Sequence, residues 1–525
     1  LGDDVTISNA TGDGLGNIQF NSTIDGGNDL TINAGTGTLT LAGIIGATNP
    51  LGDLNIAFGS ALALPATSLA TSKNLTVTSN GAITQTGALT IPGTTTVSAS
   101  GQNVTLSHAS NSFTGAINIT GAAVDIENNI ATILGSSTVS STYALDSNGA
   151  ITQNGALAIN GATTLVTSAN DATITLGTNT NAFTGALSIT TNDESGTDAH
   201  VTIDGGTTAL NIAASTIDGD LTLTSGHASG IVDSGAVTVG GNLTATTDNN
   251  NGVINMGTLA VAGNIDLTTH GSGNATIDNG SLNVALDASS IGGDLTVTSG
   301  AEAGITDNDT VTVGGNLTAT TDNNNGVINM DTLAVDGTIA LTTNGSGNAT
   351  VVNDQGLAFA ASTVGGALSA TATTGNITDS GTLAITGAST FVTKASGSNI
   401  ILDDSGNTFS GAVTMKADTA GNEDFGDITF VDSADVKLDL NAGDEGDLFI
   451  DASTDGAVGG NLSVTASNGN ITQGVALAVT GNTTLNALNS GNVTLSNALN
   501  SFTGAINITG AAVDIENNIA TILGS

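Results

Sequence analysis

Internal repetition constrains the fold of this 525-residue chain more than any other feature of its sequence. The segment VTVGGNLTATTDNNNGVINM occupies residues 237–256 and returns unchanged at residues 311–330. A longer segment, NSFTGAINITGAAVDIENNIATILGS, occupies residues 111–136 and returns unchanged at residues 500–525. Repeats of this kind are typical of solenoids, in which each unit buries its apolar face against the next unit. The chain is therefore expected to be an array of stacked repeats.

The spacing of the expected strand starts gives the length of one coil. Leu221, Leu243 and Ile265 follow one another at intervals of 22 residues, and Leu295 follows after 30 more. The strands are short, and they alternate apolar residues with Thr, Asn or Asp, which is the pattern of a half-buried strand. We predict an all-β fold, a right-handed parallel β-helix (β-solenoid) with coils of about 22 residues. A tandem array of β-sandwich domains stays open as the alternative.

The repeats divide the chain into four segments. The solenoid is expected to start in residues 1–74, to carry two recurring motifs in residues 75–220, to contain two repeats of 74 residues in residues 221–367, and to continue in residues 368–525 with an acidic insertion at 418–451. More repeats follow the segment at 111–136, and its second copy lies at 500–525. We therefore expect the array to continue beyond residue 525.

Two motifs recur at expected corners of the coils. The first reads GAITQTGAL at residues 81–89, and related copies begin at positions 149, 375 and 469. The second reads Asn-x-Phe-(Thr/Ser)-Gly. Its phenylalanines are expected to fill the core at one recurring wide place, and they are Phe113, Phe183, Phe409 and Phe502.

Glycine and asparagine mark further corners. A glycine pair followed by Asn or Asp, as in Gly240-Gly241-Asn242, precedes several strands and is expected to form a turn with positive φ. Asparagine runs such as residues 248–251 suit turns as well, and aligned Asn side chains are expected to form ladders between coils.

Composition excludes several classes of partner and site. The chain has 4 basic residues, all lysine, against 46 acidic ones, so its formal charge is −42. Nucleic-acid binding needs a cationic surface, which this chain cannot build. The absence of cysteine excludes a disulfide framework and a cysteine-ligated metal. No apolar run is long enough for a transmembrane helix.

The sequence indicates no catalytic site and no cofactor. The four histidines, His108, His200, His227 and His270, form no metal-binding pair, and the last two lie in turns rich in Gly and Ser. No nucleophile elbow or phosphate-binding loop is present. We therefore expect a protein that is not an enzyme, with a carbohydrate-binding or carbohydrate-cleaving β-helix as one alternative.

Calcium binding is the one metal site that the sequence raises. Acidic residues crowd within 418–451, and carboxylate and carbonyl oxygens are the ligands that Ca²⁺ prefers. The candidate ligands are Asp418, Glu423, Asp424, Asp444, Glu445 and Asp447. The competing interpretation is that these carboxylates are solvated turn residues. A Ca²⁺-dependent surface-layer component is thus a second alternative function.

The repeats resemble those of a known family. GAITQTGALTIPGTTTVSASGQNVTLSHASNSFTGAINITG, which starts at residue 81, is similar to the repeat region of filamentous-haemagglutinin-like exoproteins, and residues 28–57 share its style. These are large surface adhesins of Gram-negative bacteria, secreted by the two-partner (type V) route. The resemblance implies a location outside the cell or on its surface.

Together these features predict a structural and adhesive rod or filament of a bacterial cell surface or matrix. Its expected partners are other copies of itself, through head-to-tail or lateral assembly, and surface glycans or host receptors. The acidic charge is expected to lie on outward faces and at corners, where it keeps long rods soluble and separate.

Overall fold

A computed structural model describes residues 1–9, 16–177, 181–192, 198–417, 426–439, 447–450 and 457–524. Residues 439, 447–450 and 457 are described by their backbone alone. The strands belong to two compact units, unit 1 at Leu1–Gly263 and unit 2 at Asn264–Ser525, and each is considered by itself. Within the described ranges all regular elements are strands, and none is a helix.

Both units are parallel β-solenoids, with about 21 turns in all at intervals of about 22 residues. The predicted fold class is confirmed, and the alternative of tandem sandwich domains is wrong. None of the described residues lies in a helix long and apolar enough to cross a membrane.

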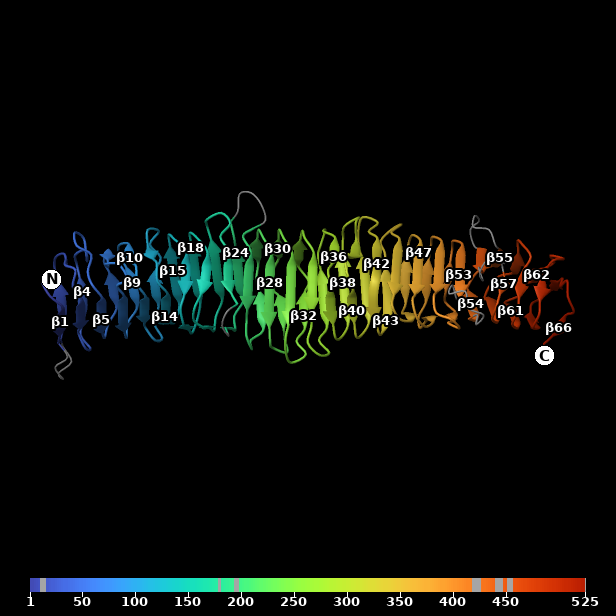
Figure 1. Cartoon of the computed structure of the whole chain (residues 1–525), viewed down its shortest axis with the longest axis horizontal. Coiled ribbons are helices and arrows are strands. Elements are labelled where there is room, and N and C mark those ends of the chain that lie inside the picture. Colours follow the sequence, from blue (N-terminus) through green and yellow to red (C-terminus); the bar gives the residue numbers. More distant parts are fainter. Residues whose placement is uncertain are drawn as a thin grey trace. The chain divides into compact units, whose positions relative to one another are not determined.

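A typical coil of unit 1 has three short strands. One coil contains β8 (Leu75–Ser79), β9 (Ile83–Gln85) and β10 (Leu89–Ile91), and the next contains β11 (Thr95–Ser98), β12 (Val104–Leu106) and β13 (Ser112–Phe113). β8 pairs with β11, β9 with β12 and β10 with β13, and all three pairs are parallel. The strands of this unit therefore lie side by side in chain order along each of its faces (Figure 1).

Unit 2 repeats this plan. One of its coils contains β47 (Leu368–Ala372), β48 (Ile377–Asp379) and β49 (Leu383–Ile385), and the next contains β50 (Ser389–Thr393), β51 (Ile400–Leu402) and β52 (Thr408–Phe409). The next coil begins with β53 (Val413–Ala417) and β54 (Ile428–Asp432). Equivalent strands of successive coils pair in parallel.

A narrow core of small aliphatic side chains fills each unit. Along β28 (Leu221–Ser225) burial alternates strictly, as the period-two pattern predicts. The four motif phenylalanines are buried, with exposed fractions of 0% for Phe113, Phe183 and Phe502 and 3% for Phe409, so their predicted place in the core is confirmed. In unit 2, Phe409 also lies within an aromatic row, with ring centroids 6.1 Å from Phe391 and 5.1 Å from Phe430.

Glycine is required in the corner pairs for a different reason from the one expected. Neither Gly240 nor Gly241 has a positive φ. A Cβ atom on Gly241 would instead lie 2.8 Å from the carbonyl carbon of Gly219, in the preceding coil. Glycine is required here because two backbones approach closely, and the predicted positive φ is wrong at these positions. The asparagine run does adopt it, with φ of 55° at Asn250 and 53° at Asn251.

Asn and Asp side chains form a hydrogen-bonded column at one corner. In unit 1 the carboxylate of Asp29 accepts from the backbone N–H of Asp53 at 2.7 Å, and Asp53 in turn accepts from that of Asn74 at 2.7 Å. The expected ladder therefore exists, and at this corner its shortest bonds run from a side-chain oxygen to a backbone N–H, while Nδ2 of Asn74 also donates to Asp53 at 3.3 Å. Amides of successive coils bond to each other elsewhere in unit 1, as from Asn148 to Asn129 at 3.3 Å. Lys73 lies against Asp29, with Nζ 2.8 Å from Oδ1, and its hydrogen bond lowers the pKa of the Asp29 carboxyl.

Candidate functional site: side-chain clamps between successive coils

The two recurring sequence motifs meet in space. Gln85 ends β9, and Asn111 lies just before β13 in the following coil. The Nε2 of Gln85 donates to Oδ1 of Asn111 at 2.8 Å, and the Nδ2 of Asn111 donates to Oε1 of Gln85 at 3.0 Å. The GAITQ and Asn-x-Phe motifs are therefore two halves of one reciprocal amide pair, which we call a clamp.

Asn111 joins three successive coils. Its Oδ1 also accepts from the backbone N–H of Leu89 in the preceding coil at 2.9 Å. Its Nδ2 donates to the carbonyl of Leu106 in its own coil at 2.8 Å and to that of Glu127 in the following coil at 3.1 Å. The side chain is completely buried, so each of these bonds forms away from solvent. Bonds of this kind in a low-dielectric interior strengthen a network and fix its register.

Two further clamps, Gln153–Asn181 in unit 1 and Gln473–Asn500 in unit 2, have the same reciprocal geometry. Asp379–Asn407 in unit 2 is a one-way variant at the same place, and we count it as a clamp too. In each, the asparagine Oδ1 also accepts a backbone N–H of the preceding coil, from Leu157, Leu383 or Leu477. The Asp379 clamp differs because a carboxylate replaces the amide, and it accepts from Nδ2 of Asn407 at 2.6 Å.

A second set of asparagines holds a strand of the preceding coil, and we call each of them a strand lock; the locks at Asn128 and Asn517 hold the strand that follows a clamp. The Oδ1 of Asn128 accepts from the backbone N–H of Phe113 at 2.9 Å, and its Nδ2 donates to the carbonyl of the same residue at 3.2 Å. Nδ2 also donates to the carbonyl three residues ahead, that of Ala131. Asn353 holds Val335 in this manner, and Asn517 holds Phe502.

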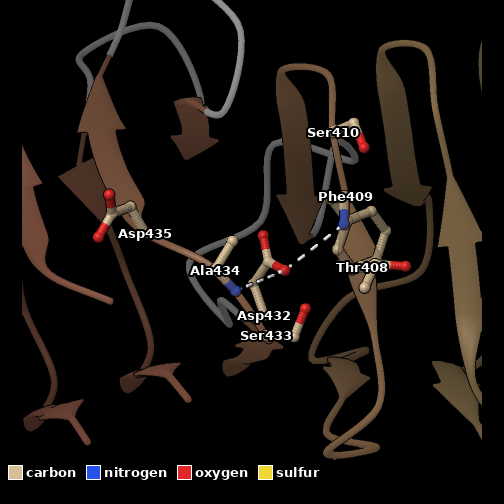
Figure 2. A pocket seen from close by; sticks show the side chains of 7 residues that line it. All are labelled: Thr408, Phe409, Ser410, Asp432, Ser433, Ala434 and Asp435. Carbon is tan, nitrogen blue, oxygen red and sulfur yellow. Dashed lines mark hydrogen bonds between the residues drawn. The ribbon is translucent and has the colours of Figure 1, made fainter. Parts of the chain in front are cut away.

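Asp432 occupies the strand-lock position of the acidic clamp. It ends β54, its exposed fraction is 4%, and one of its oxygens accepts from the backbone N–H of Phe409 at 3.5 Å and of Ala434 at 3.3 Å. Burial raises the pKa of the Asp432 carboxyl above its ordinary value, and the backbone N–H groups of Ala434, Phe409 and Ser433 oppose this change. Figure 2 shows both hydrogen bonds converging on the same carboxylate oxygen.

The predicted calcium ligands lie mostly outside the described residues. This holds for Asp418, Glu423, Asp424, Asp444 and Glu445, and Asp447 is described only as the first residue of strand β56 (Asp447–Ile450). Within the described part of the chain, no group of three or more acidic or histidine side chains is placed to hold a metal ion. His108 and His227 lie in turns, where each Nδ1 accepts a nearby backbone N–H.

Comparison with known proteins assigns the repeats to a family. A family described as repeats of unknown function (DUF5649) matches residues 51–120, 121–190, 198–256, 346–416 and 426–509, well over half of the chain. The chain belongs to this family. No curated protein and no solved structure matches it.

The matched DUF5649 segments correspond to the clamps. Four of the five segments each contain one clamp in full, namely Gln85–Asn111, Gln153–Asn181, Asp379–Asn407 and Gln473–Asn500. The segment at 198–256 contains neither clamp motif. The sequence motifs identified the clamp residues individually. Their pairing was missed, because the partners lie 26 to 28 residues apart and belong to different coils.

Proposed function

We propose that this chain is a structural and adhesive rod of a bacterial cell surface or extracellular matrix, without catalytic activity. The observation that carries the proposal is the recurrence of the clamp in four of the five matched repeats. An active site is needed once, whereas a device that resists separation of coils is useful in every repeat. Each clamp asparagine bonds to neighbouring coils through a fully buried side chain, as at Asn111.

The charge of the chain supports the same role. A formal charge of −42 keeps elongated molecules soluble and apart from one another through mutual repulsion. The resemblance of the repeats to filamentous-haemagglutinin-like exoproteins favours secretion from a Gram-negative bacterium. The partners that this role implies are surface glycans or host receptors, together with other copies of the chain in a filament.

Electron microscopy tests the structural part of this proposal. Negatively stained molecules of the 525-residue chain should be thin, unbranched rods of uniform width, and compact globules would contradict the proposal. Labelling intact source cells with an antibody against the chain tests the location. Signal on unpermeabilised cells is expected, and signal that requires permeabilisation would contradict a surface role.

A glycan array separates adhesion from a purely structural role. Binding to a defined set of glycans with no release of reducing sugar is expected. Turnover of a polysaccharide would contradict the non-enzymatic part of the proposal.

A further inference from the structure

Asp432 stands at a position that an asparagine occupies in other coils. Asp432 and Asn128 each end a strand, and each accepts the backbone N–H of a motif phenylalanine, Phe409 or Phe113. The residue after each of them donates its backbone N–H to the carbonyl of the clamp asparagine, at 2.9 Å in both coils. The same backbone bond, at 2.7 Å, follows the lock at Asn517. The three positions are therefore equivalent places of the repeat.

The amide of Asn128 holds both backbone groups of Phe113. Its Oδ1 accepts the N–H at 2.9 Å, and its Nδ2 donates to the carbonyl at 3.2 Å. One side chain can reach both groups because the N–H and C=O of a residue in an extended strand point the same way. An ionised carboxylate only accepts hydrogen bonds. Asp432 therefore holds Phe409 by its N–H alone, and that bond is longer, at 3.5 Å.

A proton on Asp432 would make its side chain equivalent to the amide. A neutral carboxyl group has one O–H donor and keeps an acceptor oxygen. The oxygen that accepts from Phe409 corresponds to Oδ1 of Asn128, so the other oxygen takes the place of Nδ2, from which an O–H can donate to the Phe409 carbonyl. A hollow of about 340 Å³ opens beside these two residues and lets solvent deliver the proton.

The surroundings of Asp432 favour the protonated form. Burial raises the pKa of its carboxyl, although three backbone N–H groups oppose this change, and the strand on one side places Ala466 opposite it. The neighbouring strands and turns carry four carboxylates and two lysines among the side chains that the structure describes: Asp379, Asp403, Asp404, Asp435, Lys416 and Lys437. Both lysines alternate with buried residues of β53 and β55 (Val436–Asp439), so they point outward from the core.

We propose that Asp432 is a proton-operated strand lock, which takes up a proton in mildly acidic solution and then holds Phe409 by both backbone groups, as Asn128 holds Phe113. At neutral pH the ionised carboxylate holds only the N–H, so β52 is bound less firmly to the next coil. The stabilisation is complete below the pKa of an unfolded aspartate, about 4, and is lost as the pH rises through the higher pKa of the folded chain. This device does not rest on the proposed adhesive function.

Asp432→Asn makes the lock permanent and provides the first test. Hydrogen exchange of a peptide that contains Phe409, read by mass spectrometry, compares the natural full chain with D432N in the same buffer, so the intrinsic exchange rate cancels. At pH 7.5 the peptide should exchange about tenfold more slowly in D432N. At pH 5 the difference should fall below about threefold. Most exposed carboxylates remain ionised at pH 5, so the chain keeps its acidic character there.

Asn128→Asp is the reverse variant, because it places the acid in a lock of unit 1. The peptide that reports on Phe113 must begin before His108, since residues 111–136 and 500–525 are identical. It should exchange about tenfold faster than in the natural chain at pH 7.5 and recover most of its protection at pH 5. Equal exchange of the Phe409 peptide in the natural chain and D432N at pH 7.5 would overturn the proposal. A difference of the same size at both pH values would overturn it too, because Asp432 would then not titrate in this range.

Discussion

Gln85 and Asn111 exchange two hydrogen bonds between successive coils, with donor–acceptor distances of 2.8 and 3.0 Å. Asn111 is fully buried beside Phe113, and Gln85 is half-buried. Parallel strands alone would allow neighbouring coils to slip in register by two residues and keep their apolar faces inward. A reciprocal amide pair accepts only one register, so the clamp determines how the coils stack.

Replacing Asn111 with alanine should destabilise unit 1 by about 3 kcal/mol. The change removes the bonds to Gln85, Leu106 and Glu127, and it leaves the buried N–H of Leu89 without an acceptor. Urea unfolding followed by circular dichroism measures the loss. Asn129→Ala is the matched control, because Asn129 is exposed and its side chain accepts only one long bond, from Asn148 at 3.3 Å. The control should change stability by less than about 0.5 kcal/mol, and an equal loss in both variants would refute the role of the clamp.

Gly241→Ala should destabilise the chain by about 2 kcal/mol, because the new Cβ would lie 2.8 Å from the carbonyl carbon of Gly219 and force two coils apart. Gly257→Ala is the control, since a Cβ there meets nothing within 4 Å and its φ is not positive. The control should be neutral or slightly stabilising. Thermal unfolding of both variants decides between close approach and turn conformation as the reason for the glycine pair. If Gly241→Ala and Gly257→Ala lower the free energy of unfolding by the same amount, the close approach of two backbones is not the reason for glycine at position 241.

Much of the architecture follows from sequence because a repeat displays its own period. The interval from Leu221 to Leu243 gave the coil length, and the Asn-x-Phe motif placed Phe113 in the core. Local conformation was less predictable. Gly241 and Asn250 both looked like positive-φ residues, yet only Asn250 adopts that conformation. The reason for glycine at position 241 lies in another coil, which the local sequence does not reveal.

The candidate site was harder to predict than the fold. Gln85 and Asn111 belong to motifs with different spacing, and their contact depends on how one coil lies on the next. Asp432 is one of many acidic residues in the sequence. Only the structure shows that Asp432 takes the place that Asn128 has in another coil, since each accepts from the backbone N–H of a motif phenylalanine. Asp432 is buried there, and burying a negative charge is unfavourable.

Tyr143→Phe should stabilise unit 1 by about 1 kcal/mol. Tyr143 has an exposed fraction of 1%, and its hydroxyl has no hydrogen-bond partner, so folding removes that group from water without compensation. Phenylalanine keeps the ring and the packing between Val124 and Thr163. Urea unfolding at neutral pH measures the difference. A less stable variant would mean that the hydroxyl is satisfied in solution.

The same residue predicts a loss of stability in alkali. Burial raises the pKa of the Tyr143 phenol above its ordinary value of 10.0, so the folded chain retains the phenolic proton at a pH where the unfolded chain releases it. The free energy of unfolding should therefore fall as the pH rises above about 10. The fall should be smaller in Tyr143→Phe, and subtracting the two profiles removes the contribution of the lysines. Because Tyr143 is the only tyrosine, phenolate absorbance reports its ionisation directly, and it should appear only together with unfolding.

The duplicated segment provides a test of coil stacking within a single spectrum. Val124 and Leu134 are buried, with exposed fractions of 2% and 0%, and the backbone N–H of Val124 donates to Thr142 in the next coil at 2.8 Å. In a polypeptide that ends at residue 525, the same residues of the second copy, Val513 and Leu523, are 48% and 74% exposed. Both copies yield the peptide VDIENNIATIL, so hydrogen exchange of that polypeptide, read by mass spectrometry, should split this one peptide into two isotope envelopes of equal area.

The second duplication supplies the control for that experiment. Residues 237–256 and 311–330 are also identical, but both copies are covered, with exposed fractions of 0% at Val239 and Val313 alike. Their shared peptide should exchange as a single slow envelope, because its apolar positions are equally buried in both places. Splitting of this control peptide, or a single envelope for VDIENNIATIL, would contradict the stacking of coils described above. Protection of a segment from hydrogen exchange is thus expected to depend on whether a neighbouring coil covers it and not on the segment's own sequence.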